Sequence, residues 1–189
     1  MALNPVSVDN YNGLSFIGGS SNKPIAGIAT NIDRHTVSQA RLTATDIIPA
    51  GSPVKVSNNA STATGAGKQL NPNVLKAEKA AAAADVSGFL LVNETDILQM
   101  GEKAPRAYNG QLVNVALLGS LTELYLPCDN TVQDISLASK VAWDFTDGCL
   151  KVDTAGTIQV IGPVVDGIKF KVNGDSCEYE ACKVVKVRL

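Results

Sequence analysis

The sequence predicts a mainly β fold: a small antiparallel β-barrel or sandwich preceded by an extended N-terminal arm. From residue 47 onward, short runs of apolar and β-branched residues recur at short intervals, with turn residues between them. Two of these intervals, around Asp147-Gly148 and Asn173-Gly174, have the composition of hairpin turns. Strands do not alternate with helical segments, as they would in a doubly wound sheet. Seven or more strands spaced in this way are typical of an antiparallel barrel or sandwich.

The first 40 residues differ from the rest of the chain. Gly13, Gly18 and Pro24 interrupt this stretch, which has no sustained helical or strand period. It nevertheless carries more apolar side chains than a solvated linker normally does. An extended arm laid on a partner would account for them, because apolar burial offsets the entropy lost on ordering. We therefore predict an arm over residues 1–40 and a β-barrel domain over residues 41–189. The alternative is that the early residues form the first strands of the fold.

Residues 47–93 contain the first predicted strands. A turn at 49–53 leads into Val54–Val56, whose residues alternate as in a half-buried strand. The polar segment 58–73 is expected to be a long surface loop. The alanine-rich segment 77–85 favours one short helix, because alanine is the best helix former. It lacks an amphipathic period, however, so both helix and strand stay open there.

Further strands are predicted along the rest of the chain. They are Gly88–Asn93, Gln111–Leu118, Leu121–Leu126, Lys140–Phe145, Cys149–Val152, Thr157–Val165, Ile168–Val172 and Cys177–Leu189. The third of these should stop at Pro127, which cannot donate a ladder hydrogen bond. Asp147-Gly148 should form a hairpin turn with both residues at positive φ. Residues 173–176 should form a second hairpin.

Composition limits the classes of partner. Charged residues make up 18% of the chain, below the roughly 25% of average domains. Low charge suits contacts with proteins, because charged groups are costly to desolvate. The net charge is −2, and lysine and arginine are spread along the sequence, so we expect no nucleic-acid partner. With neither a basic leader nor a long apolar run near Met1, we also expect no membrane contact and synthesis in the cytoplasm.

No residues are assigned to catalysis, to a cofactor or to a metal, and we expect no enzymatic activity. His35 is the only histidine, so any nucleophile-histidine arrangement would have to use it. It lies in the irregular N-terminal part and is expected to be solvated or locally hydrogen-bonded. Gly65–Lys68 resembles a phosphate loop, but Thr62 replaces the required glycine and Gln69 the required serine or threonine.

Other reactive side chains also have ordinary structural interpretations. The cysteines lack the paired spacing of zinc ligands and are expected to be small buried or half-buried residues; they are Cys128, Cys149, Cys177 and Cys182. Asp144 and Asp147 are expected to shape a turn, and Glu178 and Glu180 to lie on the wet face of a strand. Trp143 is expected to be a core residue. A hydrolase with dispersed carboxylates is the third hypothesis and has no positive support.

Six short motifs follow one another over residues 47–189. They are Ile48-Pro-Ala-Gly-Ser-Pro-Val54, Ala84-Asp-Val-Ser-Gly-Phe-Leu90, Tyr108-Asn-Gly-Gln-Leu-Val-Asn-Val-Ala116, Ala138-Ser-Lys-Val-Ala-Trp-Asp-Phe145, Asp147-Gly-Cys-Leu150 and Thr157-Ile-Gln-Val-Ile-Gly-Pro-Val-Val165. This order resembles that of tailed-bacteriophage capsid decoration (structural cement) proteins and the related head-fibre proteins. The first 40 residues and the segment 58–73 have no counterpart in the resemblance.

The resemblance implies a small β-barrel on the outer surface of a virion. The expected partner is the major capsid protein, with self-association as a homotrimer in some members. Within the arm, we assign capsid binding to the apolar side chains Tyr11, Leu14, Phe16 and Ile17. The alternative is a head-fibre or adhesin-like module that binds a host surface or a glycan.

Overall fold

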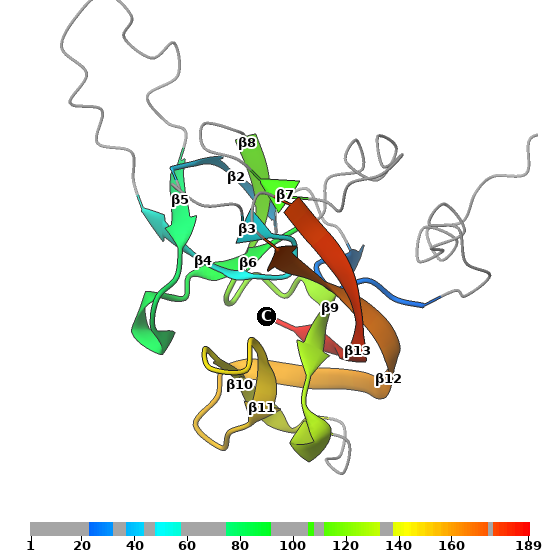
Figure 1. Cartoon of the computed structure of the whole chain (residues 1–189). Helices are drawn as coiled ribbons and strands as arrows, with labels where there is room; N and C mark the ends of the chain where they lie inside the picture. The colour runs from blue at the N-terminus through cyan, green and yellow to red at the C-terminus, as the bar shows by residue number, and fades with distance from the viewer. Residues whose placement is uncertain are drawn as a thin grey trace, which may run out of the picture.

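The computed structural model describes residues 23–31, 37–43, 48–57, 75–91, 106–107, 112–132, 138–173 and 176–189. This part of the chain is mainly β, which confirms the predicted fold class (Figure 1). The strands are β1 (Ala29–Asn31), β2 (Val37–Leu42), β3 (Ile48–Pro49), β4 (Pro53–Ser57), β5 (Leu75–Lys79), β6 (Gly88–Leu90), β7 (Arg106–Ala107), β8 (Leu112–Leu117), β9 (Glu123–Cys128), β10 (Lys140–Asp144), β11 (Cys149–Val152), β12 (Ile158–Asn173) and β13 (Ser176–Arg188). Two 3₁₀ turns, Ala83–Asp85 and Asn130–Val132, complete the described elements. No helix in these ranges is long and apolar enough to cross a membrane.

One half of the molecule is a closed barrel in the strand order β2-β5-β4-β6-β8. Its β2–β5 pairing is parallel, and its other pairings are antiparallel. Small and branched apolar side chains fill its interior: Ala40, Leu42, Ile48, Val54, Ala77, Leu90, Val113 and Val115. In β8, Val113 and Val115 face this core while Leu112 is exposed, which is the period-two pattern of a half-buried strand.

The other half is a six-stranded sheet in the order β1-β9-β11-β10-β12-β13. β13 also pairs with β9, so the pairings of five strands run in a closed circuit. The long hairpin of β12 and β13 pairs from Gln159↔Arg188 to Asn173↔Ser176. It rises from this sheet toward the barrel, as Figure 1 shows.

A shared core joins the two halves. It is built mainly from the six-stranded sheet, but Phe89 of β6 and Ala116 of β8 are barrel residues that belong to it. Both are fully buried. The Phe89 ring also lies 5.5 Å from the indole of Trp143 in β10, at an interplanar angle of 58°. The barrel therefore packs on the sheet through side chains that point outward from the barrel wall.

A close contact between two turns ties residues 23–31 to this body. Gly27 and Gly51 both have positive φ, and a Cβ on Gly27 would lie 2.5 Å from the backbone nitrogen of Gly51. Gly27 N donates to Tyr125 O at 2.8 Å, and Ala26 N donates to Ile168 O at 2.8 Å. Glycine is needed at position 27 for both its backbone conformation and its space.

The observed strands revise the predicted boundary of the arm. The boundary at residue 40 falls inside β2, which is part of the barrel. β1 pairs with β9 in the six-stranded sheet. The alternative interpretation, in which early residues form strands of the fold, therefore holds for β1 and for β2. Residues 1–22 lie outside the described residues, and the arm stays a prediction for them.

Several local predictions change as well. Residues 75–79 form β5, and only Ala83–Asp85 form a 3₁₀ turn, so the alanine-rich segment is part strand and part helical turn.

β9 continues through Pro127 to Cys128. β1 pairs with Glu123 and Leu124 of β9, and β11 pairs with Cys128 of β9. Neither β1 nor β11 pairs with Pro127, so the missing N–H of Pro127 interrupts no hydrogen bond to them. The predicted strands 157–165 and 168–172 are one continuous strand, β12. The segment 58–73 lies outside the described residues.

Candidate functional site

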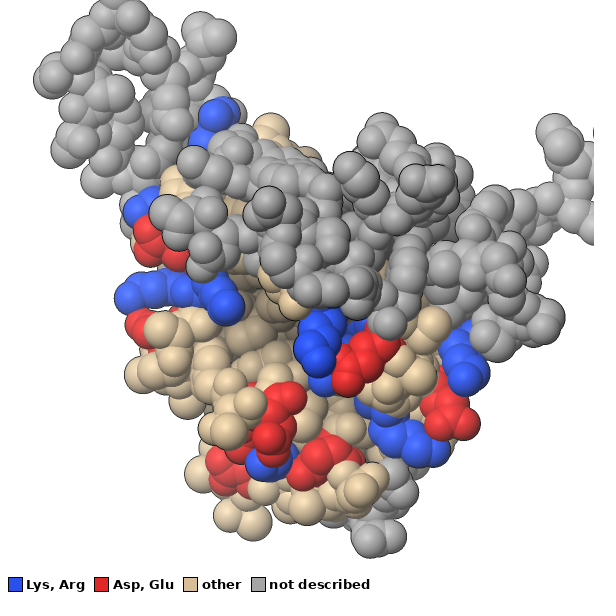
Figure 2. All heavy atoms as spheres, viewed as in Figure 1, with Lys and Arg blue, Asp and Glu red and all other residues tan. Residues whose placement is uncertain are grey.

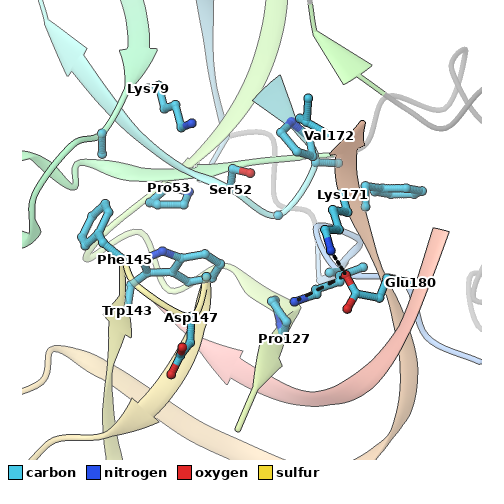
Figure 3. A pocket seen from close by; sticks show the side chains of 18 of the residues that line it. Ser52, Pro53, Lys79, Pro127, Trp143, Phe145, Asp147, Lys171, Val172 and Glu180 are labelled. Atoms are coloured by element: carbon cyan, nitrogen blue, oxygen red, sulfur yellow. Dashed lines mark ion pairs between the residues drawn. The ribbon is translucent and has the colours of Figure 1, made fainter. Parts of the chain in front are cut away.

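A recess of about 410 Å³ lies between the barrel and the six-stranded sheet (Figure 3). On the barrel side it is lined by the turn between β3 and β4 and by the end of β5. On the sheet side it is lined by β9, the β10–β11 hairpin and the upper part of the β12–β13 hairpin. Figure 2 shows this region as an uncharged hollow with lysines and carboxylates at its edges. The lining residues are Ala26, Pro49, Ala50, Gly51, Ser52, Pro53, Lys79, Ala80, Pro127, Trp143, Phe145, Thr146, Asp147, Gly148, Lys169, Phe170, Lys171, Val172 and Glu180.

One part of the wall of the recess is apolar. Trp143 and Phe145 lie side by side on the hairpin and face Pro53 across the recess (Figure 3). Phe145 is 36% exposed and Val172 is 40% exposed, which places both among the large exposed apolar side chains of the described chain. Exposed apolar groups gathered around a concave surface are typical of a binding site.

The β10–β11 hairpin holds the two aromatic side chains in place. The Asp144 carboxylate accepts hydrogen bonds from the backbone N–H groups of Thr146, at 2.7 Å, and Asp147, at 3.0 Å. Lys151 Nζ lies 2.9 Å from an Asp144 oxygen and 2.7 Å from an Asp147 oxygen. Gly148 supplies the positive φ of 61° that the turn requires. The hairpin prediction is confirmed, but its loop has four residues between Asp144 and Cys149, and Asp147 does not take a positive φ.

These hydrogen bonds and ion pairs shift the pKa values of Asp144 and Lys151. The N–H of Asp147, followed by Lys151 and the N–H of Thr146, lowers the pKa of Asp144 to about 2. The carboxylates of Asp147 and Asp144 raise the pKa of Lys151 above its ordinary value. The pKa of Asp144 is lower in the folded chain than its ordinary 3.8. The charged carboxylate therefore stabilises the folded hairpin fully at pH values above 3.8. This contribution is lost as the pH falls through about 2.

Asp144→Asn should therefore lower the melting temperature at pH 6, because it removes the charge that Lys151 and the two N–H groups bind. The difference from the unchanged protein should shrink as the pH falls from about 4 to about 2, where Asp144 itself becomes protonated. Thermal unfolding followed by circular dichroism across this range measures the effect. Asp153→Asn is the matched control, since it removes the same charge from the neighbouring exposed turn. An equal loss for both variants at every pH would contradict the role of Asp144.

Lysines outnumber carboxylates at the rim of the recess. Lys169 and Lys171 approach the same carboxylate, Glu180, at 3.9 and 4.0 Å. Lys79 is exposed on the opposite side and makes no ion pair with the described residues. Asp147 is already bound by Lys151. Among the rim lysines, Lys79 is therefore the one without an ion pair to the described residues, while Lys169 and Lys171 share a single carboxylate.

The thiols in the described part have the properties of structural cysteines. Cys128 and Cys149 are buried and Cys182 is half-buried, and all three are free. Burial raises the pKa of Cys128 to about 12 and that of Cys182 to about 11, so both stay protonated at neutral pH. Within the described ranges, no group of three or more histidine, cysteine and acidic side chains is arranged to hold a metal ion.

The site residues named from the sequence and the recess do not coincide. The predicted capsid-binding residues Tyr11, Leu14, Phe16 and Ile17 lie outside the described residues, as do His35 and Gly65–Lys68. Trp143 packs against the shared core, as predicted, but it also lines the recess. Sequence reasoning missed Phe145 and Val172.

One sequence signal could have pointed to Phe145. Val141, Trp143 and Phe145 alternate along β10 and the residue after it, so their side chains share one face. Along this row, exposure rises from a buried Val141, through a half-buried Trp143, to an exposed Phe145. The alternation is visible in the sequence, whereas the point at which the strand leaves the core is not.

No protein-family model matches the chain, and no curated protein is similar to it. The described chain is a β-barrel packed on a six-stranded sheet, with a surface recess between the two.

Proposed function

We propose that this chain is a bacteriophage capsid decoration protein that binds the outer surface of the major capsid protein lattice and stabilises the head. The observation that carries the proposal is the apolar recess. Its lining includes Phe145 and Val172, two of the five large apolar side chains that are exposed in the described chain. A hydrophobic patch with a polar rim is a typical feature of a protein-binding surface.

The architecture fits a protein that resists pressure on the head. Both halves are closed by strand pairing, and the shared core locks one half to the other. Closure of the barrel removes the sheet edges of its five strands, which limits non-specific edge-to-edge association there. The binding function then requires no titratable site, which agrees with our expectation that the protein is not an enzyme.

The sequence adds two further supports. The order of motifs over residues 47–189 resembles that of decoration and head-fibre proteins. In residues 1–22 the only charged side chain is Asp9, so the apolar residues Tyr11, Leu14, Phe16 and Ile17 can lie on a partner at a low desolvation cost. Many copies on one lattice would give a durable coat, with or without contacts between copies in a homotrimer.

Co-sedimentation with capsids tests the proposal. Capsids of the phage that encodes this chain, prepared without the protein, should bind the purified protein saturably, with a fixed ratio of bound protein to capsid subunit. Bound protein should also protect the capsids against disruption by heat. Absence of binding to both the immature and the expanded capsid would contradict the proposal.

The pair of aromatic rings in the recess favours a second candidate, a head-fibre or adhesin-like module for a host surface or glycan. Trp143 and Phe145 line the recess together with Thr146 and Asp147, and pockets of this kind bind small ligands. A glycan array with the purified protein distinguishes the candidates. Binding that Phe145→Ala abolishes would favour the glycan module, and an array without hits would count against it.

A further inference from the structure

We propose that the recess receives an apolar side chain of the major capsid protein that has an aspartate or glutamate carboxylate beside it. This inference rests on the proposed function and adds the chemistry of the capsid segment that the body recognises. It is separate from the contacts assigned to residues 1–22.

The shape of the recess fits an anchoring side chain. Trp143, Phe145 and Val172 line it on the sheet side and Pro53 on the barrel side, so an inserted apolar group would meet apolar atoms on both sides. Its volume of about 410 Å³ is near the lower end of the roughly 300–1,000 Å³ of typical ligand pockets. Protein interfaces commonly place an aromatic or aliphatic anchor in such a pocket.

The lysines at the rim indicate which kind of residue lies beside the inserted side chain on the capsid segment. Lys79 approaches from the barrel side and is free of ion pairs with the described residues. Across the recess, Lys169 and Lys171 share Glu180 at 3.9 and 4.0 Å, which is the outer limit of an ion pair. Exposed pairs of this kind are weak, so the lysines can bind an incoming carboxylate. Figure 3 shows Lys79 and Lys171 on opposite sides of the apolar walls.

The same features argue against other occupants. A neutral glycan could stack on Trp143 and Phe145 but would leave Lys79 without an ion pair to the described residues. A basic segment would be repelled by them. An extended peptide with an apolar side chain and a nearby carboxylate uses both the walls and the rim, and charge complementarity of this kind fixes the register of a complex.

Capsid binding by full-length variants tests the inference. Phe145→Asp places a charge in the apolar wall, and Lys79→Glu reverses the free rim charge. Each should weaken binding about tenfold or more, because buried anchors and matched charges dominate interfaces. The matched controls are Val152→Asp and Lys140→Glu, which introduce the same charges at exposed positions outside the recess. They should bind within about twofold of the unchanged protein. Circular dichroism confirms that each variant is folded.

A photo-crosslinking amino acid in place of Phe145 identifies the occupant. It should link to a capsid peptide that has an acidic residue next to an apolar one. A link to residues 1–22 of this protein would overturn the inference. Binding of both recess variants at full affinity would also overturn it and leave the proposed function standing. Failure of the unchanged protein to bind capsids would instead remove the proposed function.

Discussion

Replacing Phe89 with alanine should lower the free energy of unfolding by about 3–5 kcal/mol, the usual cost of truncating a buried phenylalanine. The Phe89 side chain is fully buried, starts from the barrel strand β6 and packs in the core of the six-stranded sheet. Its loss would leave a cavity at the contact between the two halves. Urea unfolding followed by tryptophan fluorescence measures the change, because Trp143 is the only tryptophan and contacts Phe89.

Phe145→Ala is the matched control for this prediction. The same truncation at this 36% exposed position should cost clearly less than at Phe89, since part of the removed surface already contacts water and no enclosed cavity is left. Similar losses for the two variants would contradict the shared core. If Phe89→Ala also separates unfolding into two transitions, Phe89 is the main coupling between barrel and sheet.

Deleting residues 1–22 should weaken capsid binding by at least about tenfold and leave the body folded. The strand pairings and both cores of the described chain are built from Ile25 onward. The predicted capsid contacts Tyr11, Leu14, Phe16 and Ile17 would all be removed. Co-sedimentation measures the binding, and thermal unfolding measures the stability.

A full-length variant with serine at these four positions controls for the shorter chain. It should reproduce the loss of binding, because it removes the apolar side chains alone. If the truncated protein does not fold, residues 1–22 belong to the sheet and the arm prediction is wrong. If it folds and binds capsids at full affinity, the capsid contact lies elsewhere on the body.

Local turn chemistry made much of the fold predictable. The two hairpins lie where Asp147-Gly148 and Asn173-Gly174 placed them. The loop length at the first was not predictable, because the Asp144 side chain binds two backbone N–H groups and so favours a wider turn. The sequence predicted that Asp144 shapes a turn, but not which backbone N–H groups its carboxylate binds.

In residues 77–85, tertiary packing overrides the intrinsic helix propensity of alanine. Ala77 is fully buried in the barrel and pairs with β4 and β2. A small side chain fits the crowded interior, so an alanine that favours a helix in isolation occupies a strand here. The pairing partners come from distant parts of the chain, and the local sequence does not specify them.

The sequence predicted two strands, 157–165 and 168–172, yet β12 is continuous and runs through Gly167. A Cβ at this position would lie 2.4 Å from a methyl of Val184 and 2.8 Å from the carbonyl oxygen of Pro24. The glycine therefore allows close packing within a continuous strand. A glycine in a β-rich sequence can either end a strand or allow close packing within one. Which of the two applies depends on the neighbouring chain segments.

The recess could not be predicted from the sequence. Its walls come from segments as far apart in the sequence as Ala26 and Glu180, and they meet only where the barrel packs on the sheet. Apolar residues such as Phe145 and Val172 look like core residues in a strand pattern. Their exposure follows from where each strand passes beyond its neighbours.

Electron cryomicroscopy of capsids saturated with the purified protein tests capsid binding most directly. We predict density for the β-body at fixed positions on the outer lattice, with residues 1–22 traced over a boundary between capsid subunits and the recess filled by a capsid segment. Capsids without added density, at protein concentrations far above those of the lattice sites, would contradict the proposed function.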